Sequence, residues 1–198
     1  MNLNNLKPLT IITGGSFTGK TELLNKISKE TNSKYINFNT EVDFKVTEEL
    51  KHWFKFVFGV DFIQPAKYTI DSNYVLRILS VGLNTKAGDV LVVENPETNL
   101  HPKAISNIAK FFVYLVSKKG VRVVAETNST DFVTSICYEV YSRNIDSDDI
   151  VFFNKSNKNN IEKINVGDSG KFVDDNGNLR KYPSGFFDAN SAELWELL

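Results

Sequence analysis

The sequence has little of what secreted and membrane proteins need: one cysteine and no long apolar run. Cys137 is the single cysteine among 198 residues, which excludes an internal disulfide and favours a reducing compartment. No apolar run approaches the roughly 18 residues of a transmembrane helix, and the first residues lack the apolar core of a signal peptide. We therefore expect a cytoplasmic protein without a membrane partner.

Neither sign of charge is in excess, and arginine is scarce. Lys and Arg total 23 against 24 Asp and Glu, which gives a net charge of -1. Any binding of nucleic acid would therefore need a local basic patch rather than a global attraction. The 41% hydrophobic and 12% aromatic residues suffice for a sizeable core. The length is most economically one domain, residues 1–198.

Strand-like and helix-like patterns alternate along most of the chain. Strands are predicted at residues 8–13, 35–38, 89–94 and 121–125. Helices are predicted at residues 20–29, 47–58, 75–83, 103–119 and 130–141. This order predicts an α/β fold with a mainly parallel sheet and flanking helices. Two further strands, at 150–153 and 161–166, and an Asn-Gly turn at 176–177 predict a small antiparallel C-terminal extension, about residues 145–198.

A complete phosphate-binding motif follows the first predicted strand and opens the first predicted helix. Its residues are Gly14, Gly15, Ser16, Phe17, Thr18, Gly19, Lys20 and Thr21. The glycines let backbone N–H groups point at phosphate oxygens. Lys20 is expected to reach the β- and γ-phosphates, and Thr21 to place its hydroxyl on Mg²⁺. An ordinary Gly-rich turn is the alternative, but the strand–loop–helix context favours a nucleoside triphosphate site in a P-loop NTPase.

An acid ends the buried strand at residues 89–94. A carboxylate in this place beside a phosphate loop holds Mg²⁺, often through water, so Glu94 is the candidate metal ligand alongside Thr21. The alternative for Glu94 is a structural cap. Asn95 follows, where many such ATPases keep a catalytic Glu; its amide can position water but cannot act as a base. Glu97 is the nearest carboxylate for that task, with a solvated turn residue as the alternative.

Several segments together resemble the ABC-type AAA class of ATPases, relatives of the ATPase heads of SMC, RecF and OLD-family proteins. They are the phosphate-binding motif and residues 90–102, which read V-L-V-V-E-N-P-E-T-N-L-H-P. One branch, with a C-terminal domain of unknown function, shows an E-N-P-E-x-H-L-H-P stretch, so that Asn95 is typical of the branch. It also shows an E-T-H-S and a G-F-F-D segment. Residues 126–129 and 185–188 correspond to these here. The resemblance implies ATP and Mg²⁺ as cofactors.

The resemblance further implies a homodimer in which each head closes over the other's nucleotide. The signature segment that closes it is expected at residues 71–74, where Ser72 can donate a hydroxyl but the usual glycines are missing. An ordinary helix cap is the alternative for Ser72. Asn128 stands in place of the switch histidine, so it can donate a hydrogen bond but carries no charge. His101 falls in the loop used at the dimer seam, or caps the next helix. Gln64 is the weak candidate for the Q-loop.

Three functions follow from these residues. The first is an ATPase that hydrolyses ATP to ADP and phosphate, with Lys20, Glu94, Asn95, Glu97 and Asn128 at the reacting centre, serving DNA repair or phage defence. The second is an ATP-gated clamp with little or no hydrolysis. The third is a P-loop kinase, which the scattered arginines disfavour. An effector protein or nucleic acid is the expected partner besides a second copy. Three lysines on or near the C-terminal hairpin either belong to a solvated loop or contact the phosphates of a nucleic acid: Lys155, Lys158 and Lys163.

Overall fold

The computed structural model describes residues 6–62 and 70–180, with side chains from residue 73 onward in the second range. The elements, in chain order, are β1 (Leu9–Thr13), α1 (Lys20–Thr31), β2 (Lys34–Ile36), α2 (Glu48–Phe58), α3 (Ile70–Leu83), β3 (Val90–Glu94), α4 (Pro102–Lys119), β4 (Arg122–Glu126), α5 (Thr130–Tyr141), the 3-10 turn η3 (Ser147–Asp149), β5 (Ile150–Asn154), β6 (Glu162–Val166) and β7 (Phe172–Val173). Every element predicted within these ranges is present, so the predicted α/β fold is confirmed.

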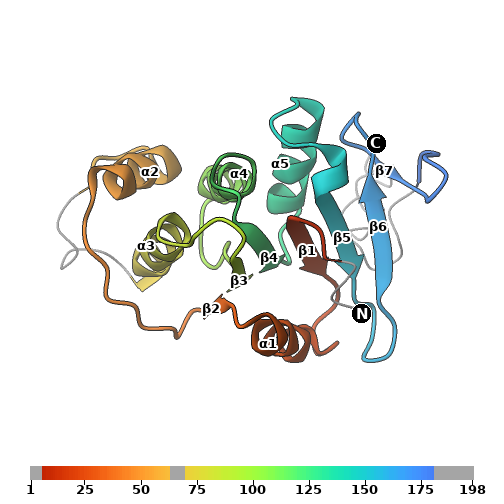
Figure 1. Ribbon diagram of the computed structural model, residues 1–198, viewed down its shortest axis with the longest axis horizontal. Helices are drawn as coiled ribbons and strands as arrows, with labels where there is room; N and C mark the ends of the chain where they lie inside the picture. Colours follow the sequence, from red (N-terminus) through yellow and green to blue (C-terminus); the bar gives the residue numbers. More distant parts are fainter. Residues whose placement is uncertain (1–5, 63–69, 181–198) are drawn as a thin grey trace, which may run out of the picture.

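The strands form one sheet in the order β2-β3-β4-β1-β5-β6-β7 (Figure 1). The first five strands in this order are mutually parallel, and β6 and β7 continue the sheet antiparallel to their neighbours. The predicted antiparallel extension is therefore confirmed for β6 and β7. β5 belongs instead to the parallel sheet, because it pairs directly with β1 in register from Leu9–Ile150 to Thr13–Asn154.

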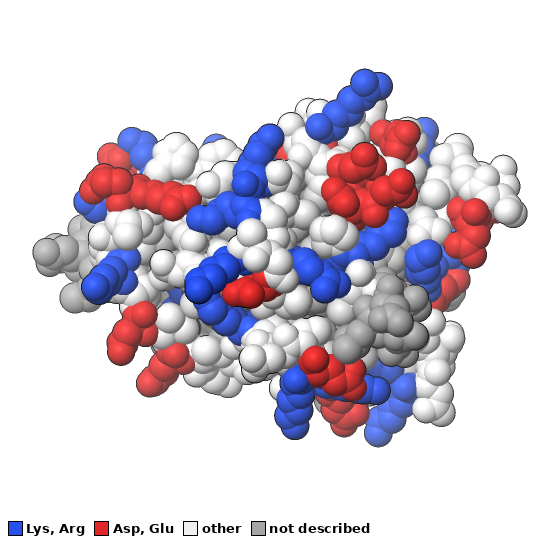
Figure 2. Space-filling view, viewed as in Figure 1, with Lys and Arg blue, Asp and Glu red and all other residues white. Residues whose placement is uncertain are grey.

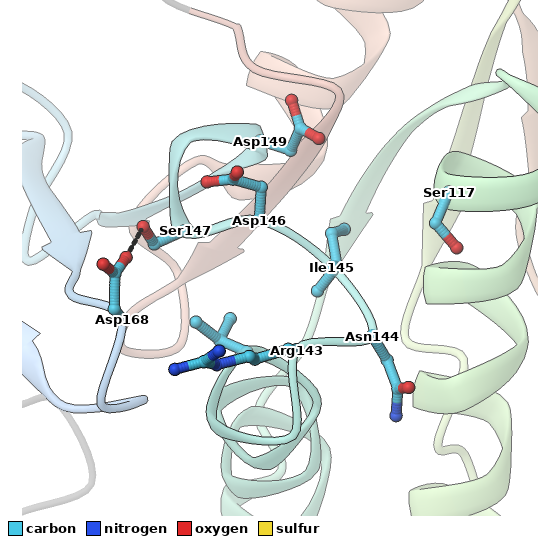
Figure 3. Close-up of a pocket in the computed structure, with 9 residues that line it drawn as sticks. Ser117, Arg143, Asn144, Ile145, Asp146, Ser147, Asp149 and Asp168 are labelled. Carbon is cyan, nitrogen blue, oxygen red and sulfur yellow. Dashed lines mark hydrogen bonds between the residues drawn. The ribbon is translucent and has the colours of Figure 1, made fainter.

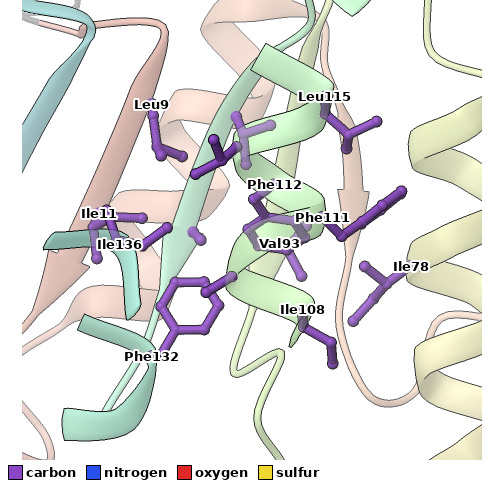
Figure 4. Packing of buried hydrophobic residues seen from close by; sticks show 14 of the residues in the cluster. Leu9, Ile11, Ile78, Val93, Ile108, Phe111, Phe112, Leu115, Phe132 and Ile136 are labelled. Atoms are coloured by element: carbon purple, nitrogen blue, oxygen red, sulfur yellow. The ribbon is translucent and has the colours of Figure 1, made fainter. Parts of the chain in front are cut away.

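Helices cover both faces of the sheet, with α1 on one face and α2 to α5 on the other (Figure 1). Alternation along the strands explains this, because successive side chains point to opposite faces. On β3, Leu91 and Val93 join the larger core beneath α3, α4 and α5, whereas Val90 and Val92 join the smaller core beneath α1. The larger core packs Phe111 and Phe112 of α4 between the strands and α3 (Figure 4).

The start of α3 differs from the sequence prediction. The helix begins at Ile70 rather than at residue 75. Residues 71–74 therefore lie within its first turns, and they do not form the loop before a helix that a signature segment would make. Tyr74 explains part of the difference, since it is fully buried in the core with Val75, Leu76 and Ile78. Burial of this apolar face stabilises the first described turns of the helix.

The helix ends follow local sequence signals more closely. Thr47 caps α2 by accepting a hydrogen bond from the Leu50 backbone N–H at 3.1 Å, and Ser129 caps α5 through the Phe132 N–H at 3.3 Å. Pro102 opens α4, and Gly120 ends it in the left-handed conformation. Among the described residues, no helix combines the length and apolar character that crossing a bilayer requires.

Candidate nucleotide-binding site

The phosphate loop connects β1 to α1 and leaves the start of this helix open. Gly19 occupies the N-cap position with a φ of 86°, and no described side chain caps the N-terminal N–H groups. These unpaired donors and the helix dipole form a site for anions. Lys20 folds back over the loop, where its Nζ donates to the carbonyls of Gly14 at 2.8 Å and Gly15 at 2.9 Å. The Lys20 ammonium and the free backbone N–H groups at the start of α1 therefore lie close together, as an anion-binding site requires.

Phe17 is an unusual residue in this loop. It adopts a φ of 61°, a left-handed conformation that L side chains other than Asn and Asp rarely enter. Its side chain is 98% exposed, so packing does not compensate for the strain. Sequence reasoning expected the glycines to supply the special backbone geometry. The structure shows that Phe17 shares that role, which places an aromatic ring at the mouth of the loop.

Thr21 and Glu94 come together, as the sequence predicted for a metal site. The Thr21 hydroxyl donates to Glu94 Oε1 at 2.6 Å. Tyr35 donates its hydroxyl to Glu94 Oε2 at 2.5 Å, and the Tyr74 hydroxyl donates to the Glu94 carbonyl. Burial and the neighbouring Glu94 raise the pKa of Tyr35, and burial first, then Glu94, raises that of Tyr74, so both phenols remain donors. Glu94 is therefore held in place by donors from three other elements, α1, β2 and α3.

This donor set fits Mg²⁺, because the ion takes hydroxyl and carboxylate oxygens together with phosphate oxygens and water. Thr21 and Glu94 are the residues that would hold it. When bound, Mg²⁺ supplies charge neutralisation on the β- and γ-phosphate oxygens. The short contact between the two side chains shows that both reach the same point.

Asn95, the residue after Glu94, and Asn128 form a hydrogen-bonded pair beside Glu94 in the site. Asn95 has a φ of 47° and accepts, through Oδ1, a hydrogen bond from Asn128 Nδ2 at 3.1 Å. Its backbone N–H donates to the Glu126 carbonyl at 3.0 Å, which ties the end of β3 to the end of β4. The two amides therefore face one another at the point where sequence reasoning placed a missing Glu and a missing His.

Glu97 lies behind this pair. Its Oε1 accepts from the Asn128 backbone N–H at 2.7 Å, and its Oε2 is buried without a hydrogen-bond partner among the described residues. Burial raises the pKa of Glu97, and the Asn128 N–H opposes that shift. Glu97 therefore positions the Asn128 backbone.

Glu126 is a site residue that sequence reasoning missed. It ends β4 directly opposite Glu94 in the parallel register. Its side chain lies 3.4 Å from Lys20 Nζ, and its Oε1 accepts from Asn128 Nδ2 at 3.3 Å. Burial raises the pKa of Glu126 to about 7, although the Lys20 ammonium lowers it in part. Its position at the end of the next buried strand was the signal available in the sequence, since parallel strands end at one edge.

These residues line one cavity of about 610 Å³ at the carboxyl ends of the parallel strands. The lining residues are Ser16, Phe17, Thr18, Gly19, Lys20, Thr21, Glu22, Glu94, Asn95, Glu126, Asn128 and Lys158. The structure thus brings together most of the predicted nucleotide-binding and catalytic residues. Glu97 is not among the lining residues, while Gly14 and Gly15 contact the site through their carbonyls. We refer to this space as the nucleotide cleft.

Other predicted residues are not among the described residues that line the nucleotide cleft. Ser72 falls in the first turns of α3, and its side chain is outside the described residues. Gln64 and the segment at residues 185–188 also lie outside them. His101 caps α4, since its Nδ1 accepts from the Lys103 backbone N–H at 3.3 Å. The cap alternative for His101 therefore holds in this chain, and a seam role is not required to explain it.

A second cavity, of about 490 Å³, lies at the opposite edge of the sheet, before the amino end of β5 (Figure 3). Asp146, Asp149 and Asp168 line it, and the Ser147 hydroxyl donates to Asp168 Oδ1 at 2.5 Å. Open α/β sheets bind ligands at the carboxyl ends of their strands, and this cavity is at the other end. Its carboxylates also repel phosphate. The nucleotide cleft is therefore the candidate site.

Known proteins share this architecture at low sequence identity. The dimeric structure of MJ0796, a bacterial ABC transporter cassette, aligns over 82% of this chain and 88% of that chain, with 14% identity and a TM-score of 0.50. The chain has the P-loop fold of an ATP-binding cassette. The same cassette in a post-hydrolysis state bound to ADP and Pi aligns over 80% and 87%, with 13% identity and a TM-score of 0.49.

Family models match parts of the chain. A protein family of unknown function, DUF2813, matches residues 70–166, and a second family of unknown function, DUF3696, matches residues 145–197. Among curated proteins, none matches the sequence. The first model covers β3, β4 and the ends of both strands, where Glu94 and Glu126 lie. The second covers the C-terminal strands and the position of residues 185–188.

Proposed function

We propose that this chain binds ATP with Mg²⁺ and hydrolyses it slowly to ADP and phosphate. The observation that carries this proposal is the meeting of Thr21 and Glu94 at 2.6 Å beside Lys20 and the open N-terminus of α1. Lys20 and the loop N–H groups would bind the phosphates. Asn95 and Asn128 would orient the attacking water through their amides. Catalysis would rest on positioning and on electrostatic stabilisation.

The rate is expected to be low, because Asn128 stands where the resembled ATPases keep a switch histidine and because residues 71–74 lack the glycines of a signature segment. The expected reaction is tested by steady-state phosphate release from Mg·ATP by the unaltered chain and by Lys20→Ala. Loss of the Lys20 ammonium removes the cation that contacts the transferred phosphate, so we expect release to fall by at least about 100-fold. Phosphate release by Lys20→Ala at the unaltered rate would refute hydrolysis at this site.

A second candidate function is an ATP-gated clamp that closes without turnover. The amide pair of Asn95 and Asn128 favours it, because no base stands at either position. In this case ATP would drive dimerisation while phosphate release stays at background. Light scattering with and without Mg·ATP, run beside the phosphate assay, separates the two functions. An unchanged mass with ATP would remove the clamp and the proposed homodimer together.

A kinase function has less support in the site. Such enzymes place arginines over the transferred phosphate, yet Arg77 donates to the carbonyl of Thr40 and, at 3.1 Å, to that of Phe38. Arg122 donates to the Leu6 carbonyl at 3.3 Å, and Arg180 pairs with Glu162. None of the three is among the described residues that line the nucleotide cleft.

The wider role proposed is that of a head in the SMC, RecF and OLD-like class, with one domain spanning residues 1–198. The motif resemblance and the shared P-loop fold support it. A nucleic acid or an effector protein would be the partner, in DNA repair or in defence against phage. On the face in Figure 2, basic and acidic side chains are interspersed, so this face offers mixed charge rather than a basic stripe. A pull-down from cells would identify the partner.

A further inference from the structure

The turn between β5 and β6 packs directly on the phosphate loop. β5 lies beside β1, so the residues after both strands emerge at the same edge of the sheet. The Lys155 N–H donates to the Thr13 carbonyl at 2.8 Å, just before the loop begins. Gly14 fits against this turn only without a side chain, because a Cβ there would lie 2.1 Å from the Lys155 carbonyl oxygen. The turn therefore forms a wall of the nucleotide cleft.

Hydrogen bonds within the turn hold it in shape. The Lys155 side chain is buried, and its Nζ donates to the carbonyls of Asn157 at 3.1 Å and Lys158 at 2.8 Å. Asn157 Oδ1 accepts from the backbone N–H groups of Asn159 at 2.9 Å and Asn160 at 2.8 Å. Two of the three N–H donors of the Lys155 ammonium thus brace the backbone of the turn. The backbone of Lys158 is held in place through its carbonyl, which accepts from Lys155 Nζ, and Lys158 lines the cleft.

The described residues that line the cleft carry more acidic than basic side chains, which makes the charge of Lys158 important for binding an anion. Lys20 and Lys158 are the two cations among its described lining residues, against Glu22, Glu94 and Glu126. Lys20 is already paired with Glu126 at 3.4 Å, whereas Lys158 forms no salt bridge with any described residue. A polyphosphate entering this cleft brings several negative charges close to three carboxylates. An ammonium on the facing wall that has no salt-bridge partner among the described residues offsets that repulsion.

We propose that Lys158 is a second nucleotide-binding cation, which contacts the phosphate chain of a nucleoside triphosphate from the β5–β6 turn while Lys20 contacts it from the phosphate loop. This inference rests on the proposed ATP binding and extends it to a residue outside the phosphate-binding motif. It also explains why the turn is held by hydrogen bonds from Lys155, since a fixed backbone lowers the entropy lost when the Lys158 side chain binds a ligand.

The test is the dissociation constant of Mg·ATP for the unaltered chain, Lys158→Ala, Lys158→Arg and Lys163→Ala. Lys163 is the matched control, because it is exposed on the adjoining β6 and does not line the cleft. Loss of one charge-assisted contact should raise the dissociation constant for Lys158→Ala about tenfold. Lys158→Arg should recover most of the affinity, since the charge is kept, and Lys163→Ala should match the unaltered chain.

Two failures are distinguishable in this experiment. If the unaltered chain binds Mg·ATP and Lys158→Ala binds equally well, the role of Lys158 is refuted while the proposed function stands. If the unaltered chain binds no ATP, both are refuted. An equal loss in Lys163→Ala would also overturn the inference, because it would reduce the effect to general charge. Thermal unfolding of each variant establishes that all four proteins are folded.

Discussion

Glu126 has the most perturbed acid–base environment among the residues of the cleft. It is 2% exposed, and its Oε2 has no hydrogen-bond partner among the described residues. The Lys20 ammonium at 3.4 Å offsets part of the cost of burying the charge. Removal of one partner from such a pair leaves the other unpaired, so the two residues are expected to act as a unit.

This environment predicts a pH dependence of stability. The pKa of Glu126 is about 7 in the folded chain and 4.5 in the reference state, so the folded chain binds more protons between those values. Its contribution to stability is complete below pH 4.5 and is lost as pH rises through 7. The loss amounts to about 3 kcal/mol. We expect the free energy of unfolding, measured in urea, to fall from pH 5 to pH 8 by more in the unaltered chain than in Glu126→Gln.

The comparison with Glu126→Gln isolates most of this effect, because groups distant from Glu126 titrate alike in both proteins. Glu97 also has a raised pKa and remains in the variant, so some slope persists there. Parallel stability curves for the two proteins between pH 5 and pH 8 would show that Glu126 does not take up a proton in this range.

Phe17 predicts a stabilising substitution. A left-handed conformation costs an L residue about 1–2 kcal/mol, and glycine adopts it without that cost. Glycine also raises the entropy of the unfolded chain, which offsets part of the gain. We expect Phe17→Gly to raise the free energy of unfolding by up to about 1 kcal/mol. Phe17→Ala is the control, since it removes an exposed ring yet keeps the strain. Equal stability of all three proteins would argue against strain at this position.

At the scale of elements, a polar side chain joins two helices. Asn107 of α4 is 8% exposed and donates through Nδ2 to the carbonyls of Phe56 at 2.9 Å and Val57 at 3.4 Å. These carbonyls belong to the last turn of α2, where partners within the helix are missing. Asn107→Ala should therefore lower the free energy of unfolding by about 1–3 kcal/mol.

Chemical denaturation measures this effect. Lys103→Ala is the control on the same helix, because its side chain is exposed near the N-terminus, and its change should stay within about 0.5 kcal/mol. If the unfolding midpoints of the Asn107 variant and the unaltered chain coincide, the bond between α4 and α2 contributes nothing to stability.

The elements could be predicted from the sequence wherever the signal is local. Short continuous apolar runs located β1 and β3, and helical patterns with their terminal residues located α4 and α5, each to within a few residues. The start of α3 was predicted five residues too late, because the sequence does not show that Tyr74 is buried against Phe38 and the end of β3. The pairing of β5 with β1 was missed for a similar reason. Nothing near residue 150 reports which strand becomes its neighbour.

At the scale of the molecule, sheet order explains which site residues were found. β1 lies between β4 and β5, so the ends of three parallel strands surround the phosphate loop. The motif residues Lys20, Thr21 and Glu94 could be predicted, because their spacing carries the chemistry. Lys158 reaches the site through strand order and register, which no short motif encodes. Glu126 opens the segment at residues 126–129, but the motif alone did not show that its carboxylate would lie beside Lys20. The same order separates the acidic cavity in Figure 3 from the nucleotide cleft.

The central claim is that this cleft binds ATP together with Mg²⁺. Isothermal titration calorimetry with ATP, in Mg²⁺ and in EDTA, tests it for the unaltered chain and for Lys20→Ala. The account predicts saturable one-site binding by the unaltered chain, at least about tenfold weaker in EDTA because Thr21 and Glu94 then lack the bridging ion. It predicts a loss of about 100-fold or more in Lys20→Ala. Equal affinity of the two proteins in Mg²⁺, or no binding by either, would contradict the account.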